Sequence, residues 1–292
     1  MSASAVYSPA TKETADKESP VTNKLAALRY EIAVANRILA HEGVLDAFGH
    51  VSARHPDDPN RYFLSRSRAP ELVEPDDILE YNLDSEPVRD AKVPLYSERV
   101  IHGEIYKARP DVMAVCHHHA PAFMPLVISG IDYIPVFHLG AVGGFKPPFW
   151  DQRQEFGDTN LLVVKPEEGA SLARKLGKHW MVLMNRHGVT VAGSTVRDCV
   201  LRSIYSMRNA EFQEAAANAG PIGPLSPGEV EKCFGIGTAT TGQGRAWESW
   251  VVRLDKAGGT PQQPGREIAA RPAKRAAKPA AKRVVKKAGK RR

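Results

Sequence analysis

Three consecutive histidines, His117, His118 and His119, follow the apolar residues 113–116. Alternate side chains of a β-strand point to the same face, so we expect His117 and His119 to point together and His118 to point away. Two imidazoles on one strand face can bind one divalent metal ion. The pattern therefore predicts a metal site, although a His-x-His pair also arises by chance.

A fourth histidine and one carboxylate extend this pattern. His187 follows the apolar residues 180–184, and Gly188 after it permits a tight turn. Three histidine ligands leave an open coordination position, which is typical of catalytic metal sites. Glu98 begins an expected helix, and a glutamate beside a cation can be a fourth ligand or take a proton. From composition alone, a solvated first-turn glutamate favoured by the helix dipole remains the simpler interpretation.

The segments that must position these residues alternate between helices and strands. Apolar spacing, breakers and caps predict helices over residues 24–41, 97–109 (with Ser97 as the N-cap), 169–176 and 194–217. Strands are expected over residues 50–54, 62–65, 112–119 and 180–184, while the apolar residues 161–165 have no clear assignment. This alternation predicts an α/β layered domain.

Composition indicates a soluble protein of the reducing cytoplasm. Of 292 residues, 42% are hydrophobic and 25% are charged, as in an ordinary globular enzyme. No apolar run reaches the length of a membrane helix, and the N-terminus lacks the apolar region of a secretory signal. The three cysteines, Cys116, Cys199 and Cys233, are far apart in the chain, which argues against a disulfide scaffold.

The positive charge of the chain belongs to its C-terminal tail. Residues 261–292 hold twelve Lys and Arg and one Glu, a net of +11, so the overall +7 leaves 7 − 11 = −4 for the rest. We expect a disordered segment over 1–22, one domain over 23–255 and a disordered basic tail over 256–292. Such a tail would bind nucleic acid or anionic surfaces weakly and in a salt-dependent way.

Together these motifs resemble the class II aldolase/adducin family over residues 25–250. In that family a Ser-Glu pair precedes an Arg-Pro-Asp turn and then a strand that ends in His-x-His. The matching residues here are Ser97-Glu98, Arg109-Pro110-Asp111 and His117-His118-His119. The family's Asn-x-His-Gly motif matches Asn185-Arg186-His187-Gly188, and its Gly-Asn-x-Ser motif appears as Gly49-His50-Val51-Ser52.

The resemblance implies a three-layer α/β/α sandwich on a mixed central sheet. It also implies that His117, His119 and His187 bind one divalent metal ion and that Glu98 is the catalytic acid/base. Zinc suits three histidines best, and manganese, iron or cobalt would also bind. A homotetramer with active sites at subunit boundaries is implied as well. Adducin-like members without catalytic function lack the ligands that this chain keeps.

Three departures from the sugar-phosphate aldolases concern the substrate. His50 replaces an asparagine that helps hold the phosphate, and the Thr-Pro-Thr-Gly phosphate loop is replaced by residues 64–70. The tyrosine after Ile-Pro-x-x-His is lost, since Leu139 follows His138. Arginine binds planar carboxylates as readily as phosphates. The residues expected to bind substrate are His50, Ser52, Ser65, Arg66, Ser67, Arg68 and His138.

These departures favour the decarboxylase-like branch of the family. We expect a metal-dependent lyase that decarboxylates a hydroxy-substituted aromatic or unsaturated dicarboxylate through an enolate-like intermediate. One alternative is a class II aldolase that cleaves a small hydroxy-carbonyl substrate of the sugar-phosphate type. An alternative of another class is a non-catalytic, adducin-like protein whose basic tail binds an anionic surface.

Overall fold

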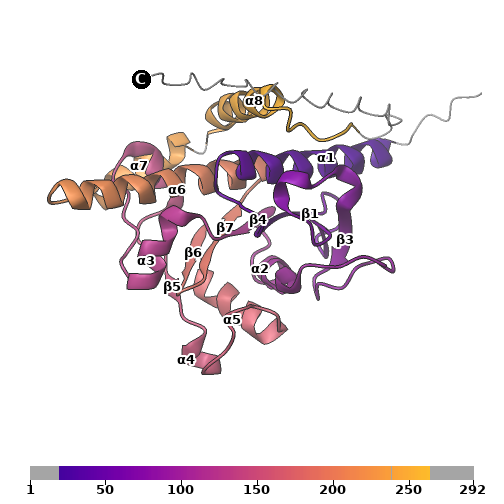
Figure 1. Cartoon of the computed structure of the whole chain (residues 1–292), viewed down its shortest axis with the longest axis horizontal. Helices are drawn as coiled ribbons and strands as arrows, with labels where there is room; N and C mark the ends of the chain where they lie inside the picture. Colours follow the sequence, from indigo (N-terminus) through magenta and orange to yellow (C-terminus); the bar gives the residue numbers. More distant parts are fainter. Residues whose placement is uncertain (1–19, 238, 264–292) are drawn as a thin grey trace, which may run out of the picture.

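The computed structural model of the chain describes residues 20–237 and 239–263 (Figure 1). Residues 1–19 and 264–292, which include most of the two segments expected to be disordered, lie outside the described residues. Side chains are described from Lys24 onward, apart from residues 236–238. None of the described helices is long and apolar enough to cross a membrane.

A seven-stranded sheet forms the centre of the fold, in the order β3-β2-β1-β4-β7-β6-β5. Neighbouring strands are antiparallel, except that β5 runs parallel to β6, so the sheet is mixed. The strands are β1 His50–Arg54, β2 Arg61–Ser65, β3 Ile78–Asn82, β4 Ala114–His118, β5 Phe149–Trp150, β6 Met181–Met184 and β7 Gly188–Gly193. The central strand β4 carries the first histidines, and its register places His117 beside His50 of β1 and Thr190 of β7.

Helices cover both faces of this sheet (Figure 1). The helices α1 and α6 pack on one face with α8 against them, whereas α2 and α5 pack together on the other face. The helices are α1 Pro20–His41, α2 Val100–Ala108, α3 Met124–Ser129, α4 Arg153–Phe156, α5 Pro166–Leu176, α6 Val196–Ala219, α7 Pro227–Gly237 and α8 Thr240–Lys256. The predicted three-layer α/β/α sandwich is therefore confirmed.

Alternation along β4 divides the core between the two faces. Ala114 and Cys116 belong to the apolar cluster under α1 and α6, whereas Val115 belongs to the cluster under α2 and α5. Every residue of β4 is buried, because helices cover both sides of the sheet. A histidine at the end of this strand is therefore placed in a dry, rigid setting.

The predicted helix over residues 97–109 begins differently from the expectation. Ser97 is not its N-cap, because a 3-10 turn at Ser97–Arg99 follows Tyr96 and makes no side-chain cap. Helix α2 proper begins at Val100. Glu98 has φ −88° and ψ 17°, outside the helical region, at the kink between the turn and the helix. This kink frees Glu98 from the helix surface, so that its side chain can point toward β4.

The body of the protein continues past the predicted boundary at residue 255. That boundary falls inside α8, and the residues after α8 bind the body of the domain. Arg37 Nη1 donates to the carbonyl oxygen of Gly259 at 2.9 Å, and the Gln262 N–H donates to Glu74 Oε2 at 2.8 Å. The chain therefore remains packed against α1 and the Glu74 turn to at least Gln262.

Candidate active site

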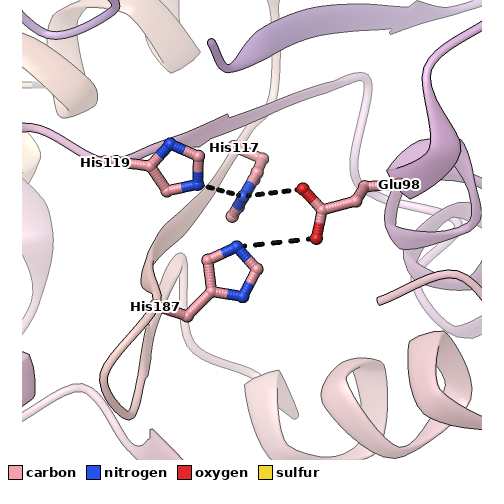
Figure 2. Close-up of side chains that lie close together, drawn as sticks. All are labelled: Glu98, His117, His119 and His187. Atoms are coloured by element: carbon pink, nitrogen blue, oxygen red, sulfur yellow. Dashed lines mark hydrogen bonds and ion pairs between the residues drawn. The ribbon is translucent and has the colours of Figure 1, made fainter. Parts of the chain in front are cut away.

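Four side chains from three separate parts of the chain converge beside the end of β4 (Figure 2). The Nε2 atoms of His117 and His119 lie 3.1 Å apart. His187 lies in the turn between β6 and β7, with its Nε2 3.5 Å from Glu98 Oε1. Glu98 Oε2 lies 3.7 Å from His117 Nε2. One ligand atom from each residue lies within 4.8 Å of those of the other three, close enough to share one metal ion.

The middle histidine of the triplet lies on the other side of the sheet. His118 packs against Phe123, with 5.6 Å between ring centroids, and its Nδ1 accepts from the Ala120 N–H at 3.3 Å. His117 and His119 point together toward His187, as the alternation of strand side chains predicts (Figure 2). His118 is therefore a core residue and not part of the cluster.

A hydrogen bond from His117 to Thr190 favours one tautomer of the His117 imidazole. Thr190 Oγ1 donates to Met184 Sδ at 3.3 Å, so its lone pair is free to accept from His117 Nδ1 at 3.1 Å. The proton of a neutral His117 then sits on Nδ1, and Nε2 offers a lone pair to the cluster. Burial lowers the pKa of His117, His119 and His187, which favours neutral imidazoles. Neutral imidazole nitrogens and a carboxylate fit a divalent metal ion.

Glu98 is a buried carboxyl with a perturbed pKa. Only 8% of the residue is exposed, and burial raises its pKa, although His187 and a hydrogen bond to the carboxyl oppose the rise. That hydrogen bond comes from the Val163 N–H to Oε1 at 3.0 Å. Residues 161–165, which had no sequence assignment, thus form an irregular segment that holds Glu98. A buried carboxyl of this kind is suited to proton exchange.

A cavity of about 450 Å³ opens beside the cluster. Glu98 and His119 reach it from the cluster, and three of the residues expected to bind substrate, His50, Ser67 and Arg68, line it as well. Its remaining walls come from Ala47, Phe48, Gly49, Ala69, Leu95, Tyr96, Ser97 and Leu162. Arg68 is the one arginine among the lining residues, so the cavity has one guanidinium to bind an anion.

The other residues expected to bind substrate do not line this cavity. Ser52 and Ser65 are fully buried in β1 and β2, and Ser52 is hydrogen-bonded to His102 beneath the cavity. Arg66 does not line the cavity and is paired with Asp77. His138 lines a different cavity, together with Leu139, Tyr205 and Arg208, so within one subunit it does not meet the cluster.

Asp77 orders the two arginines of the loop, and no sequence motif marks it. Its Oδ1 accepts from Arg66 Nε at 2.6 Å and its Oδ2 from Arg68 Nη1 at 2.5 Å and from the Glu74 N–H at 2.8 Å. Burial raises the pKa of Asp77, but these hydrogen bonds and charges lower it by more, so its net pKa is low. One carboxylate and two guanidinium groups leave a single net positive charge beside the cavity.

Several residues that support the site were not among the expected site residues. Tyr96 lies over His50, with 4.5 Å between ring centroids, and its hydroxyl donates to the backbone oxygen of Arg68. His102 is hydrogen-bonded to His50, and Thr190 is hydrogen-bonded to His117. His102 comes one turn after Glu98, so the sequence places it on the same face of the expected helix, whereas Tyr96 and Thr190 carry no such signal.

Comparison with known proteins bears on this arrangement. The class II aldolase and adducin N-terminal domain matches residues 30–213. The decarboxylase tropJ of Talaromyces stipitatus is 31% identical over 243 residues, which are 76% of this chain and 91% of that protein. A 3,4-dihydroxyphthalate decarboxylase of Arthrobacter keyseri is 28% identical over 256 residues, 82% of this chain and 98% of that protein.

Solved structures share the fold. An L-fuculose 1-phosphate aldolase from Glaciozyma antarctica superposes with a TM-score of 0.68 at 20% identity, over 87% of this chain and 97% of that one. An aldolase II superfamily protein from Pseudomonas syringae gives a TM-score of 0.69 at 20% identity, over 84% and 97% of the two chains. The predicted family is therefore confirmed, and this chain belongs to the class II aldolase and adducin family.

Proposed function

We propose that this protein is a metal-dependent carbon–carbon lyase that decarboxylates a hydroxy-substituted aromatic or unsaturated dicarboxylate. The observation that carries the proposal is the placement of one guanidinium, Arg68, in the same cavity as the Glu98–histidine cluster. A dicarboxylate has one carboxylate to lose and another to be held, and Arg68 is suited to hold the second. Two of the relatives are a decarboxylase and a 3,4-dihydroxyphthalate decarboxylase, which supports this reaction class.

The cluster supports a metal-assisted reaction. His117, His119 and His187 would hold the ion, with Glu98 beside them. A bound divalent ion would supply Lewis-acid stabilisation of negative charge on neighbouring substrate oxygens. We propose zinc, because three imidazoles and a carboxylate suit it best, and manganese, iron and cobalt bind the same donor set.

Glu98 would act as the general acid. When carbon dioxide leaves, the electron pair of the broken bond stays on the substrate carbon as an enolate-like carbanion. A neutral Glu98 carboxyl can protonate that carbon and then regain a proton from water. Glu98 is buried and lines the same cavity as Arg68, so its carboxyl is placed to exchange a proton with a substrate bound there.

The decisive experiment joins metal analysis to product analysis. Purified protein should contain about one divalent ion per chain, and the metal-loaded enzyme should release CO2 from 3,4-dihydroxyphthalate. Glu98→Gln should retain the metal and lose at least about a hundredfold in turnover, as expected for a lost acid/base. The exposed Glu167→Gln on α5 is the matched control and should behave like wild type.

Other outcomes of that experiment separate the alternatives. Metal-dependent release of an aldehyde from a hydroxy-carbonyl substrate, without CO2, would assign the aldolase reaction instead. Protein that binds no metal would contradict the lyase and favour an adducin-like binding role. The cluster itself argues against that role, because Glu98 and the three histidines converge closely enough to share an ion.

Assembly and location complete the proposal. We propose a homotetramer in the reducing cytoplasm, with each active site at a boundary between subunits, as the family resemblance implies. Phe48 and Leu162 line the cavity and are 68% and 40% exposed, so an apolar rim is available for a neighbouring subunit to cover. Light scattering at micromolar concentration should give the mass of four chains, and a monomer would contradict the assembly.

A further inference from the structure

A continuous chain of four buried side chains leads from the interior to the cavity. Tyr106 Oη lies 2.7 Å from Ser52 Oγ, which lies 2.6 Å from His102 Nδ1. His102 Nε2 lies 2.7 Å from His50 Nδ1, and His50 lines the cavity. Ser52 and His50 come from β1, whereas His102 and Tyr106 come from α2, so the chain joins the sheet to the helix that follows Glu98.

Two orders of the protons direct every bond of this chain the same way. In a third arrangement Ser52 Oγ would accept from both Tyr106 and His102, and its own hydroxyl proton would then have no partner among the described residues. In the first order, Tyr106 donates to Ser52, Ser52 donates to His102 Nδ1, and His102 Nε2–H donates to His50 Nδ1. In the second order every bond is reversed, and the Tyr106 hydroxyl proton has to find another acceptor. Among the described residues Tyr106 Oη has no second hydrogen-bond partner, and Tyr106 is only 1% exposed. The second order would bury an unpaired donor, so the first order is favoured.

We propose that this chain fixes His50 as the tautomer with its proton on Nε2, so that His50 presents a permanent neutral donor to the cavity. In the first order Nδ1 of His50 accepts, and a neutral imidazole then carries its one proton on Nε2. Apart from a contact of the His50 side chain with its own backbone, Nε2 makes no hydrogen bond to another described residue, which leaves it for an anionic oxygen of the substrate. The identity of that ligand atom, a carboxylate or enolate oxygen, rests on the proposed function. The tautomer of His50 rests only on the hydrogen bonds of the chain.

The chain orients His50 for binding an anionic oxygen and does not relay protons to it. If His50 gave up its Nε2 proton and the chain refilled it, each proton would move one place and Tyr106 would become a phenolate. Burial raises the pKa of Tyr106 far above that of free tyrosine, so this shift is unfavourable. His50 is therefore a fixed binding group, and Ser52, His102 and Tyr106 are positioning residues that act through it.

Neutron diffraction of the zinc-loaded protein, exchanged into D2O, tests the tautomer directly. We expect deuterium on His50 Nε2, none on His50 Nδ1, and the Ser52 deuteron directed at His102. Deuterium on His50 Nδ1 would overturn the inference. The measurement needs no substrate, so it decides the tautomer even if the proposed reaction is wrong.

A pair of variants at His102 tests the consequence for binding. A glutamine there can accept from Ser52 through its oxygen and donate to His50 through its amide, which preserves the order, whereas a leucine cannot. With the zinc-loaded enzyme and phthalate as the probe, His102→Leu should weaken binding by about tenfold. His102→Gln should stay within about threefold of wild type.

The two variants also separate positioning from packing. Equal weakening by both would mean that His102 matters for packing alone, and unchanged affinity in both would mean that His50 is not the donor. Either result would overturn the inference. Metal content and urea unfolding control for the fold, and if His102→Leu does not fold, the Gln variant and the neutron measurement still decide. Failure of wild type to bind phthalate would count against the proposed substrate class, and the tautomer result would stand apart from it.

Discussion

The two loop arginines should differ in function although they share one partner. Arg66 and Arg68 both bind the carboxylate of Asp77, at 2.6 Å and 2.5 Å, and the side chain of each is 31% exposed. Only Arg68 lines the cavity beside Glu98. Replacing either arginine by glutamine therefore removes one ion pair to Asp77. Only the replacement of Arg68 should also remove a contact to the substrate.

The expected magnitudes follow from these contacts. A charge-assisted hydrogen bond to a substrate carboxylate contributes about 1.5–3 kcal/mol, so Arg68→Gln should lower kcat/KM by about ten- to a hundredfold. Arg66→Gln should lower it by less than about threefold, because Arg66 lacks that contact. Since both arginines are partly exposed, losing either ion pair should cost only about 1 kcal/mol of folding free energy.

Steady-state CO2 release from 3,4-dihydroxyphthalate measures the first quantity, and urea unfolding measures the second. Wild type and the two variants are compared at equal metal content. Equal losses of kcat/KM in both variants would mean that the positive charge of the loop attracts the substrate in general, and that Arg68 makes no specific contact with it. A loss confined to Arg66→Gln would refute the assignment of the cavity-lining residue.

The remaining predictions concern stability and metal binding. His118→Ala should keep the metal content, because His118 faces the core, but should lower the unfolding free energy by about 1–3 kcal/mol. Asp198→Asn should cost about 3–5 kcal/mol in urea unfolding, because it leaves Arg202, paired at 2.9 Å and buried, without its counter-charge. Asp77 has a lowered pKa, so its contribution to stability is full above about pH 4 and is lost as the pH falls through the lower folded value. Asp77→Asn should therefore weaken the acid dependence of unfolding below about pH 4, and an unchanged acid profile would contradict this assignment.

The sequence was sufficient where chemistry depends on local geometry. His117 and His119 share a face because strand side chains alternate, and the same rule sends His118 to the core beside Phe123. The spacing of apolar residues likewise predicted the long helices α1 and α6 to within a few residues at each end. Local patterns made His187 and Glu98 candidates for the same site, and the family motifs then joined them to His117 and His119.

The short strands and the C-terminal helices were harder to predict. No strand was predicted over β7, Gly188–Gly193, although its β-branched residues Val189, Thr190 and Val191 favour one. Glycines at both ends of the segment weaken that pattern. The strand is nevertheless fully buried, because β4 and β6 pair with its two edges and helices cover both faces of the sheet. Helix α8 has its own apolar face, formed by Trp247, Trp250 and Leu254, but that face is buried only where α1 and α6 meet it.

The tertiary structure alone decided which charged and polar side chains act on the cavity. Arg66 and Arg68 are equivalent in sequence and both bind Asp77, yet only Arg68 lines the cavity. The buried chain from Tyr106 to His50 joins residues more than fifty positions apart. Hydrogen-bond direction depends on which atoms are within reach in space and which are cut off from water. Sequence spacing determines neither of these. The tautomer of His50 can therefore be inferred only from the structure in which β1 and α2 are packed together.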